Sequence, residues 1–198
     1  MVINRMLVKF VGASLLTIFS MSSAYAQNSK PNILFILTDD QSFDALGSAG
    51  NPVIKTPNLD KLAAQGTKFT HVYNQGSWSP AVCAPSRAMI NTGRNLFETG
   101  MQNRKIPLNA RPDYPLWGET FRKAGYETFI TGKWHISRDA LLRSFSVGKA
   151  VHEGGMTYDH YNAVMLDIND SENRVSATYS SKKHTSELIA DEAVNFLQ

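Results

Sequence analysis

Cysteine is almost absent from this chain of 198 residues, in which Cys83 is the only one. A single cysteine excludes a disulfide bond within the chain. In an oxidising compartment such a thiol is therefore either buried or chemically converted. The chemical environment of Cys83 is for this reason the first question that the sequence raises.

A strong charge of either sign is missing as well. The chain has 20 Lys and Arg residues and 17 Asp and Glu residues, which gives a formal net charge of +3. Arg5 and Lys9 lie within the first 26 residues, which contain no acidic residue, so the rest of the chain carries 3 − 2 = +1. This balance gives no reason to expect nucleic acid as a partner. Internal repeats and low-complexity runs are absent too.

The apolar run at the amino end, Phe10 to Met21, is uncharged but too short to span a bilayer. It follows the basic Arg5 and Lys9 and precedes Ala24-Tyr25-Ala26, a typical cleavage site of an export signal. We predict a signal peptide over residues 1–26, export to the periplasm or the exterior, and no stable membrane anchor. A retained anchor is the alternative. Residues 27–198 are then 198 − 26 = 172 residues, enough for one domain with a core.

The order of apolar and polar residues is typical of an α/β protein. Residues 32–37 form a continuous apolar run that ends in Thr38-Asp39-Asp40-Gln41, as in a strand buried on both faces of a parallel sheet. The pattern predicts further helices over 57–65, 85–92, 116–124 and 186–198, strands over 67–73 and 126–130, a hairpin of strands 163–168 and 175–180, and a loop over 137–161.

Asp39 and Asp40 directly follow the first predicted strand, at the edge where open α/β sheets bind ligands. One interpretation is a turn or a helix cap, which acidic residues often form. The other is a metal site, because Ca²⁺ and Mg²⁺ take oxygen ligands and a pair of carboxylates offsets the cost of dehydrating the ion.

The single cysteine lies in the sequence Cys83-Ala84-Pro85-Ser86-Arg87. Pro85 fits the first turn of a helix and Gly93 its end, which places Cys83 at the positive end of a short helix. If the turn begins at Cys83, Arg87 returns to the same face one turn later. A thiol, a guanidinium and free backbone N–H groups would then surround a space of the size of an anion. A small buried core residue is the alternative role for Cys83.

Lys133 and His135 follow the strand predicted at 126–130. In extended backbone, residues two apart point to the same side of a sheet, so both side chains would meet at a carboxyl edge. Taken alone, the lysine could equally be a solvated charge and the histidine a loop imidazole.

Four short motifs carry a family resemblance, in this order: Asp39-Asp40, Cys83-x-Pro85-Ser86-Arg87, Thr92-Gly93-Arg94 and Gly132-Lys133-Trp134-His135. Together they resemble the type I, formylglycine-dependent sulfatases of the alkaline-phosphatase-like superfamily, over roughly residues 30–135. The resemblance implies an α/β fold with a mostly parallel central sheet, helices on both of its faces, and an incomplete carboxyl end.

The resemblance also implies a chemistry. A maturation enzyme would convert Cys83 to formylglycine, whose hydrate attacks the sulfur of a sulfate ester such as a sulfated sugar or an aryl sulfate. Asp39, Asp40 and residue 83 would bind Ca²⁺ or Mg²⁺. Arg87 and Lys133 would stabilise negative charge, and His135 would hydrogen-bond the hydrate and move its proton.

The chain departs from this family in length, because the second half of the family's enzymes supplies further metal ligands and sulfate contacts. We therefore expect the amino-terminal part of a sulfatase, with little activity alone. Three alternatives stay open: a phosphonate or phosphate monoester hydrolase of the same superfamily, a non-catalytic secreted module that binds sulfated glycans, and a purely structural fragment.

Overall fold

The computed structural model describes residues 30–73, 75–76, 82–101, 114–171 and 174–198. The chain divides into two units, Met1–Thr38 and Asp39–Gln198. The predicted signal peptide, residues 1–26, lies outside the described residues. Within the described ranges, every helix is too short or too polar to cross a membrane.

The second unit holds the helices and strands. In chain order they are η1 (Gly47–Ala49), α2 (Pro57–Gln65), α3 (Cys83–Thr92), α4 (Leu96–Thr99), α5 (Trp117–Lys123), β1 (Phe129–Lys133), α6 (Arg138–Ser144), β2 (Val147–His152), β3 (Val164–Ile168), β4 (Val175–Ser180) and α7 (Thr185–Leu197). The predicted helices are thus found within two residues of their expected bounds, and the predicted hairpin is β3 and β4.

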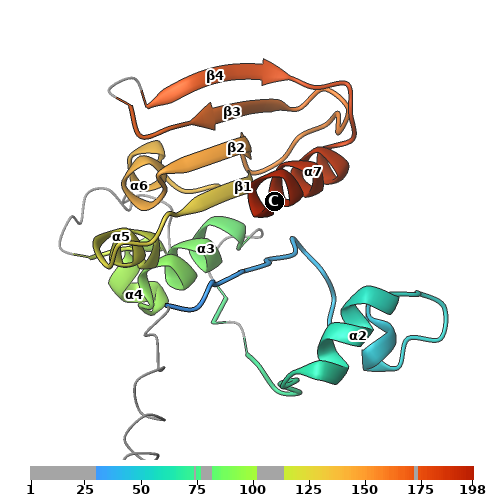
Figure 1. Ribbon diagram of the computed structural model, residues 1–198. Coiled ribbons are helices and arrows are strands. Elements are labelled where there is room, and N and C mark those ends of the chain that lie inside the picture. Colours follow the sequence, from blue (N-terminus) through green and yellow to red (C-terminus); the bar gives the residue numbers. More distant parts are fainter. Residues whose placement is uncertain (1–29, 74, 77–81, 102–113, 172–173) are drawn as a thin grey trace, which may run out of the picture. The chain divides into compact units, whose positions relative to one another are not determined.

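The four strands form one sheet in the order β1-β2-β3-β4 (Figure 1). β1 and β2 are parallel, with α6 in the crossover between them, whereas β2 with β3 and β3 with β4 are antiparallel. The α/β class is confirmed. The sheet of the described residues is mixed, however, where the sequence predicted mostly parallel strands. The short connection from β3 to β4 can only reverse the chain, since a parallel pair requires a long crossover.

Helices pack against both faces of this sheet, as expected. On one face, Val151, Leu166 and Ile168 belong to the main buried core, which includes residues of α3, α4 and α6. On the other face, Ala150 and Met165 are buried with the partly buried Tyr179 of β4 and Leu188 of α7. The two sets alternate along the strands because successive side chains point to opposite faces.

The loop predicted over residues 137–161 is wrong, since this segment contains α6 and β2. Ser137 is the N-cap of α6, and its hydroxyl oxygen accepts a hydrogen bond from the backbone N–H of Ala140 at 3.2 Å. The helix has only seven residues, too few for a clear 3.6-residue period. In β2, Ala150 has a φ of 47° and the register shifts between Gly148 and Val151, which interrupts the alternation expected of a strand.

Asp167 of β3 stabilises the irregular part of β2. Its side chain is buried and accepts hydrogen bonds from Lys149 Nζ at 2.8 Å, the Ala150 N–H at 3.0 Å and the Tyr179 hydroxyl at 3.3 Å. Burial, together with the neighbouring charge of Asp167, raises the pKa of Tyr179 to about 12. The carboxylate of Asp167 therefore accepts a hydrogen bond from the Ala150 N–H, which has no partner in the irregular pairing of β2 with β3.

Two predicted strands are corrected by the structure. Residues 32–37, in the first unit, form neither helix nor strand, and the side chains from Ile33 to Leu37 are 41% to 66% exposed. Residues 67–73 likewise form no strand, with Phe69, Val72 and Tyr73 exposed. An apolar pattern records which side chains favour burial, but a strand also requires a neighbouring strand to pair its backbone.

Candidate active site

Helix α3 holds the cysteine and the arginine of the first motif. It begins at Cys83, the first helical residue, which is partly exposed. It ends at Thr92, where Gly93 takes the left-handed conformation with a φ of 65° and donates its N–H to Met89 O at 2.8 Å. The predicted helix start at Pro85 is therefore two residues late, and the expected spacing of one turn between Cys83 and Arg87 holds.

Arg87 is a buried cation that joins α3 to the end of β1. Its side chain is 10% exposed, and Nη1 donates to the backbone oxygen of Lys133 at 2.5 Å. Nη2 lies 3.9 Å from Asp39 Oδ1. Burial lowers the pKa of the Arg87 guanidinium from its ordinary value, and the charges of Asp39 and Cys83 act in the opposite direction. Asp39 and the residue at position 83 therefore favour the charged form of this guanidinium.

Lys133 pairs with the same acidic residue. Its Nζ donates to Asp39 Oδ2 at 2.6 Å, and the two side chains are 14% and 47% exposed respectively. Asp39 thus lies between two cations, Arg87 of α3 and Lys133 at the end of β1. The structure brings together Asp39, Arg87 and Lys133, residues separated by up to 94 positions, and Cys83 lies one turn from this cluster on α3.

Trp134 anchors the second motif in the core. It is 3% exposed, its indole N–H donates to Ser137 O at 2.8 Å, and its ring meets that of Phe145 edge to face. β1 ends at Lys133, and His135 has a φ of 57°. The extended backbone that would place Lys133 and His135 on the same side therefore does not continue through His135.

His135 packs against Gly155, a contact that was not predicted. A Cβ atom added to Gly155 would lie 2.5 Å from His135 Nε2. The signal in the sequence is the dipeptide Gly154-Gly155, which was assigned only to a loop.

The predicted metal site is not assembled in the described residues. Across these ranges, no group of three or more His, Cys, Asp or Glu side chains is arranged to hold a metal ion. Two adjacent carboxylates suit a hard cation. Asp39 is, however, already paired with Lys133, and Asp40 is exposed, with a φ of 52°. Asp39, Asp40 and Cys83 are therefore not assembled around one point, and a divalent cation would have to displace Lys133 from Asp39.

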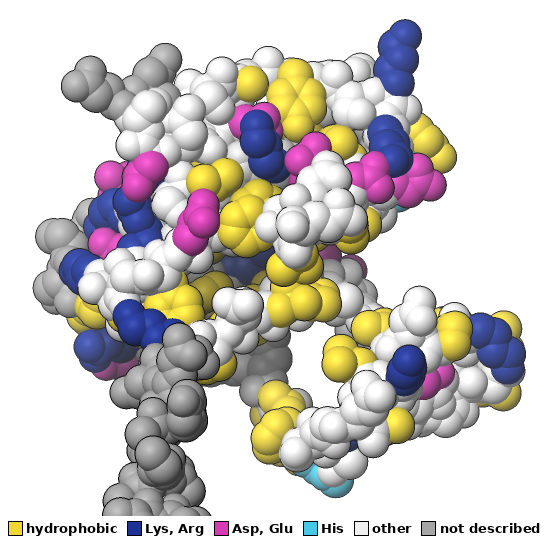
Figure 2. Space-filling model, viewed as in Figure 1, with side chains coloured by type: hydrophobic (Ala, Val, Ile, Leu, Met, Phe, Trp, Pro, Cys, Tyr) yellow, Lys and Arg dark blue, Asp and Glu magenta, His cyan; other side chains and the backbone are white. Residues whose placement is uncertain are grey.

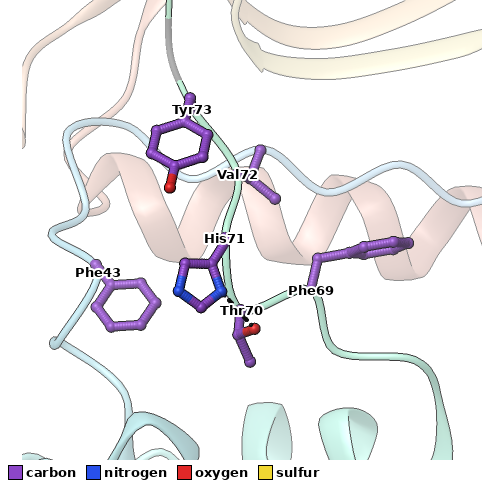
Figure 3. A pocket seen from close by; sticks show the side chains of 6 residues that line it. All are labelled: Phe43, Phe69, Thr70, His71, Val72 and Tyr73. Atoms are coloured by element: carbon purple, nitrogen blue, oxygen red, sulfur yellow. Dashed lines mark hydrogen bonds between the residues drawn. The ribbon is translucent and has the colours of Figure 1, made fainter.

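A separate open pocket is lined by Phe43 and residues 69–73 (Figure 3). His71 Nδ1 and Thr70 Oγ1 are hydrogen-bonded at 2.9 Å, and the four other lining side chains are at least 70% exposed. None of the predicted site residues lines this pocket. Of the six residues that line it, only His71 can carry a positive charge.

Charged side chains on the rest of the second unit are mostly paired with charges of the opposite sign. On the face shown in Figure 2, basic side chains lie beside acidic ones rather than in a patch of one sign. Ion pairs join Arg122 and Arg174 to Asp170, Arg143 to Glu119, and Lys183 to Asp191. Asp170, like Asp39, pairs with two cations. The cluster at Asp39 differs because it lies one helical turn from Cys83.

Comparison with known proteins decides the family. A family model described as Sulfatase matches residues 31–198. The chain belongs to the sulfatase family. This sulfatase-family chain is 32% identical over 173 residues to the N-acetylglucosamine-6-O-sulfatase of Bacteroides thetaiotaomicron. The alignment covers 87% of this chain and 28% of that protein.

Further relatives agree with this assignment. The ulvan-active sulfatase of Formosa agariphila is 40% identical over 136 residues, covering 68% of this chain and 24% of that protein. Arylsulfatase A of Bos taurus is 40% identical over 121 residues, covering 59% of this chain and 23% of that protein. The crystal structure of yidJ from Bacteroides fragilis, a protein assigned to the sulfatases, matches with a TM-score of 0.61 and 25% identity, covering 88% of this chain and 42% of that one.

These alignments confirm the sulfatase resemblance and the fold class. The chain spans between 23% and 28% of the length of the three relatives named above. The activity, the substrate and the ligands of this chain are therefore treated as proposals.

Proposed function

We propose that this chain supplies Cys83, Arg87, Lys133 and His135 for the hydrolysis of sulfate esters, such as sulfated sugars or aryl sulfates, and that it has little activity alone. The observation that carries the proposal is the position of two cations, one of them buried, on a single carboxylate one helical turn from the only cysteine. A sulfate ester presents negatively charged oxygens, and preorganised positive groups stabilise the further charge that develops on them during the reaction.

Each of these four residues has a distinct role in the proposed reaction. The hydrate of formylglycine at position 83 would supply a hydroxyl group that attacks sulfur, and the alcohol of the ester would leave. Arg87, fixed by its bond to Lys133 O, supplies a largely buried positive charge. Lys133 would contact the sulfate oxygens when its ammonium group leaves Asp39. His135 holds and moves a proton of the hydroxyl at position 83.

The proposal includes maturation and export. A maturation enzyme converts Cys83 to formylglycine, and residues 1–26 direct the protein to the periplasm or the exterior without leaving a membrane anchor. The partly exposed position of Cys83 at the start of α3, with no second cysteine in the chain, supports access to such an enzyme.

Conversion of Cys83 is expected in protein that is co-expressed with a formylglycine-generating enzyme and then exported. Mass spectrometry of the peptide that contains residue 83 should find the aldehyde or its hydrate in place of the thiol. The variant Cys83→Ala, which has no sulfur to replace, is the control. Recovery of the unmodified thiol alone would contradict the proposal and favour a binding module for sulfated glycans.

Asp39 and Asp40 are proposed as ligands of Ca²⁺ or Mg²⁺, with low affinity because Lys133 competes for Asp39. Calorimetry should detect weak binding that is lost in the Asp39→Ala, Asp40→Ala double variant. Lys133→Gln should tighten binding by up to about fivefold, since a partly exposed ion pair is worth up to about 1 kcal/mol.

The matched control for this competition is Lys149→Gln, which removes the same charge from the pair with Asp167. It should leave the metal affinity unchanged. Equal tightening by both lysine variants would mean that net charge, rather than the pair at Asp39, controls binding. An unchanged affinity in the double aspartate variant would refute the ligand assignment.

A further inference from the structure

We propose that Gly155 is a positioning residue for His135: its lack of a side chain gives the imidazole ring its place. A Cβ atom on Gly155 would lie 2.5 Å from both Cε1 and Nε2 of His135 and 3.3 Å from Nδ1. These distances are far below van der Waals contact, so the ring occupies the space that any other residue would need. The catalytic meaning of this contact rests on the proposed role of His135.

The backbone conformation does not explain this glycine. Neither Gly154 nor Gly155 is among the glycines with a positive φ, so an alanine could adopt the backbone of either position. What requires glycine at 155 is the close approach of the ring. A substitution there consequently tests the ring contact without adding backbone strain.

The segment that carries Gly155 is held against the segment that carries His135. Lys133 pairs with His152 in the parallel register, and the Trp134 N–H donates to His152 O at 2.8 Å. Four residues after Trp134, Arg138 Nε donates to Glu153 Oε1 at 2.8 Å, and Nη2 of the same guanidinium donates to Oε2. Such a bidentate pair fixes geometry as well as distance. Gly155 follows this clamp by two residues, so it cannot easily move away from the ring.

Gly154 provides a matched comparison. A Cβ atom at this position would lie 2.8 Å from Nε2 of a different imidazole, that of His152. His152 Nδ1 is 3.1 Å from Val164 O, and His152 has no part in the proposed chemistry. The two glycines are adjacent and neither has a positive φ, but each makes room for a different histidine.

The consequence for the proposed reaction is a fixed imidazole. A group that shares a proton with a hydroxyl must lie within hydrogen-bond distance of it, and a misplacement of about 1 Å can cost roughly 100-fold in rate. Because His135 follows the end of β1 and has a left-handed backbone conformation, its ring is not directed by the sheet. Gly155 supplies the surface that directs it.

The test uses the intact chain and long-range ¹H–¹⁵N NMR of the histidine rings, with signals assigned from His135→Gln and His152→Gln. Gly155→Ala should shift the ring signals of His135 and leave those of His152 in place. Gly154→Ala should do the reverse. Unchanged His135 signals in Gly155→Ala, or equal changes in both alanine variants, would overturn the proposal.

A second variant covers the case in which Gly155→Ala folds poorly. Glu153→Gln weakens the clamp to Arg138 without adding an atom near the ring, and it should also shift the His135 signals. Unchanged His135 signals in Glu153→Gln would contradict the proposal that this segment holds the His135 ring in place. The NMR measurement requires no turnover, so a failure of the proposed sulfatase activity would leave this result standing, and the converse also holds.

Discussion

Replacing Arg87 with alanine is expected to lower the free energy of unfolding by about 2–3 kcal/mol. The substitution removes a charged hydrogen bond and leaves the backbone oxygen of Lys133 without this donor at the end of β1. Hydrogen bonds to charged groups contribute about 1.5–3 kcal/mol, and a partner left without its bond adds to the loss. It also removes a cation from beside Asp39. Urea unfolding followed by circular dichroism measures the change.

Arg94→Ala is the matched control, because Arg94 follows the same helix but is exposed. Its guanidinium pairs with Glu98 four residues later at 3.2 Å, and both side chains are 42% exposed. An exposed pair of this kind is worth about 0.3–0.5 kcal/mol. The guanidinium of Arg94 also lies over the Tyr114 ring, 4.7 Å from its centroid, which adds about 0.5–1 kcal/mol. The loss expected for Arg87→Ala is therefore about twice that for Arg94→Ala. Losses of equal size would show that Arg87 is not the structural link between α3 and β1.

The elements that the sequence predicted well are those with local boundary signals. Gly93 ends α3 through its left-handed conformation, and the polar turn after residue 168 separates two strands of clear apolar character. Proline in the first turn of α2 has the same kind of local cause. Such signals need no knowledge of distant residues, so the sequence pattern is sufficient to find them.

The features that could not be predicted depend on distant partners. β2 is irregular because Asp167, seventeen residues beyond Ala150, satisfies the N–H of that residue. The pairing of Asp39 with Lys133 spans 94 positions, and the sequence indicated only that both residues belong to carboxyl edges. The need for glycine at position 155 comes from its contact with the His135 ring, which the sequence does not reveal. Residue type and spacing identify candidates for a site, whereas the sharing of one carboxylate by two cations follows from the fold.

This sharing affects activity. A polypeptide of these 198 residues, with residue 83 fully converted, is expected to hydrolyse an aryl sulfate no faster than its Cys83→Ala variant. In the described structure both cations are engaged, Lys133 with Asp39 at 2.6 Å and Arg87 with Lys133 O at 2.5 Å. Positive charge that already serves a carboxylate or a carbonyl stabilises the developing charge on sulfate poorly. Loss of a single such stabilising group typically costs about 10²–10³ in rate.

Further losses multiply this one. In the described residues the ammonium group of Lys133 holds the carboxylate of Asp39, and it must leave this carboxylate before it can contact a sulfate oxygen. A displacement of about 1 Å at the reacting groups costs roughly another 10²-fold. The measurement is release of the aryl alcohol by purified, converted polypeptide, compared with Cys83→Ala under the same conditions and with Ca²⁺ or Mg²⁺ added. Turnover well above that of the variant would mean that Arg87 and Lys133 are available to the sulfate, and that the cluster at Asp39 opens when the substrate binds.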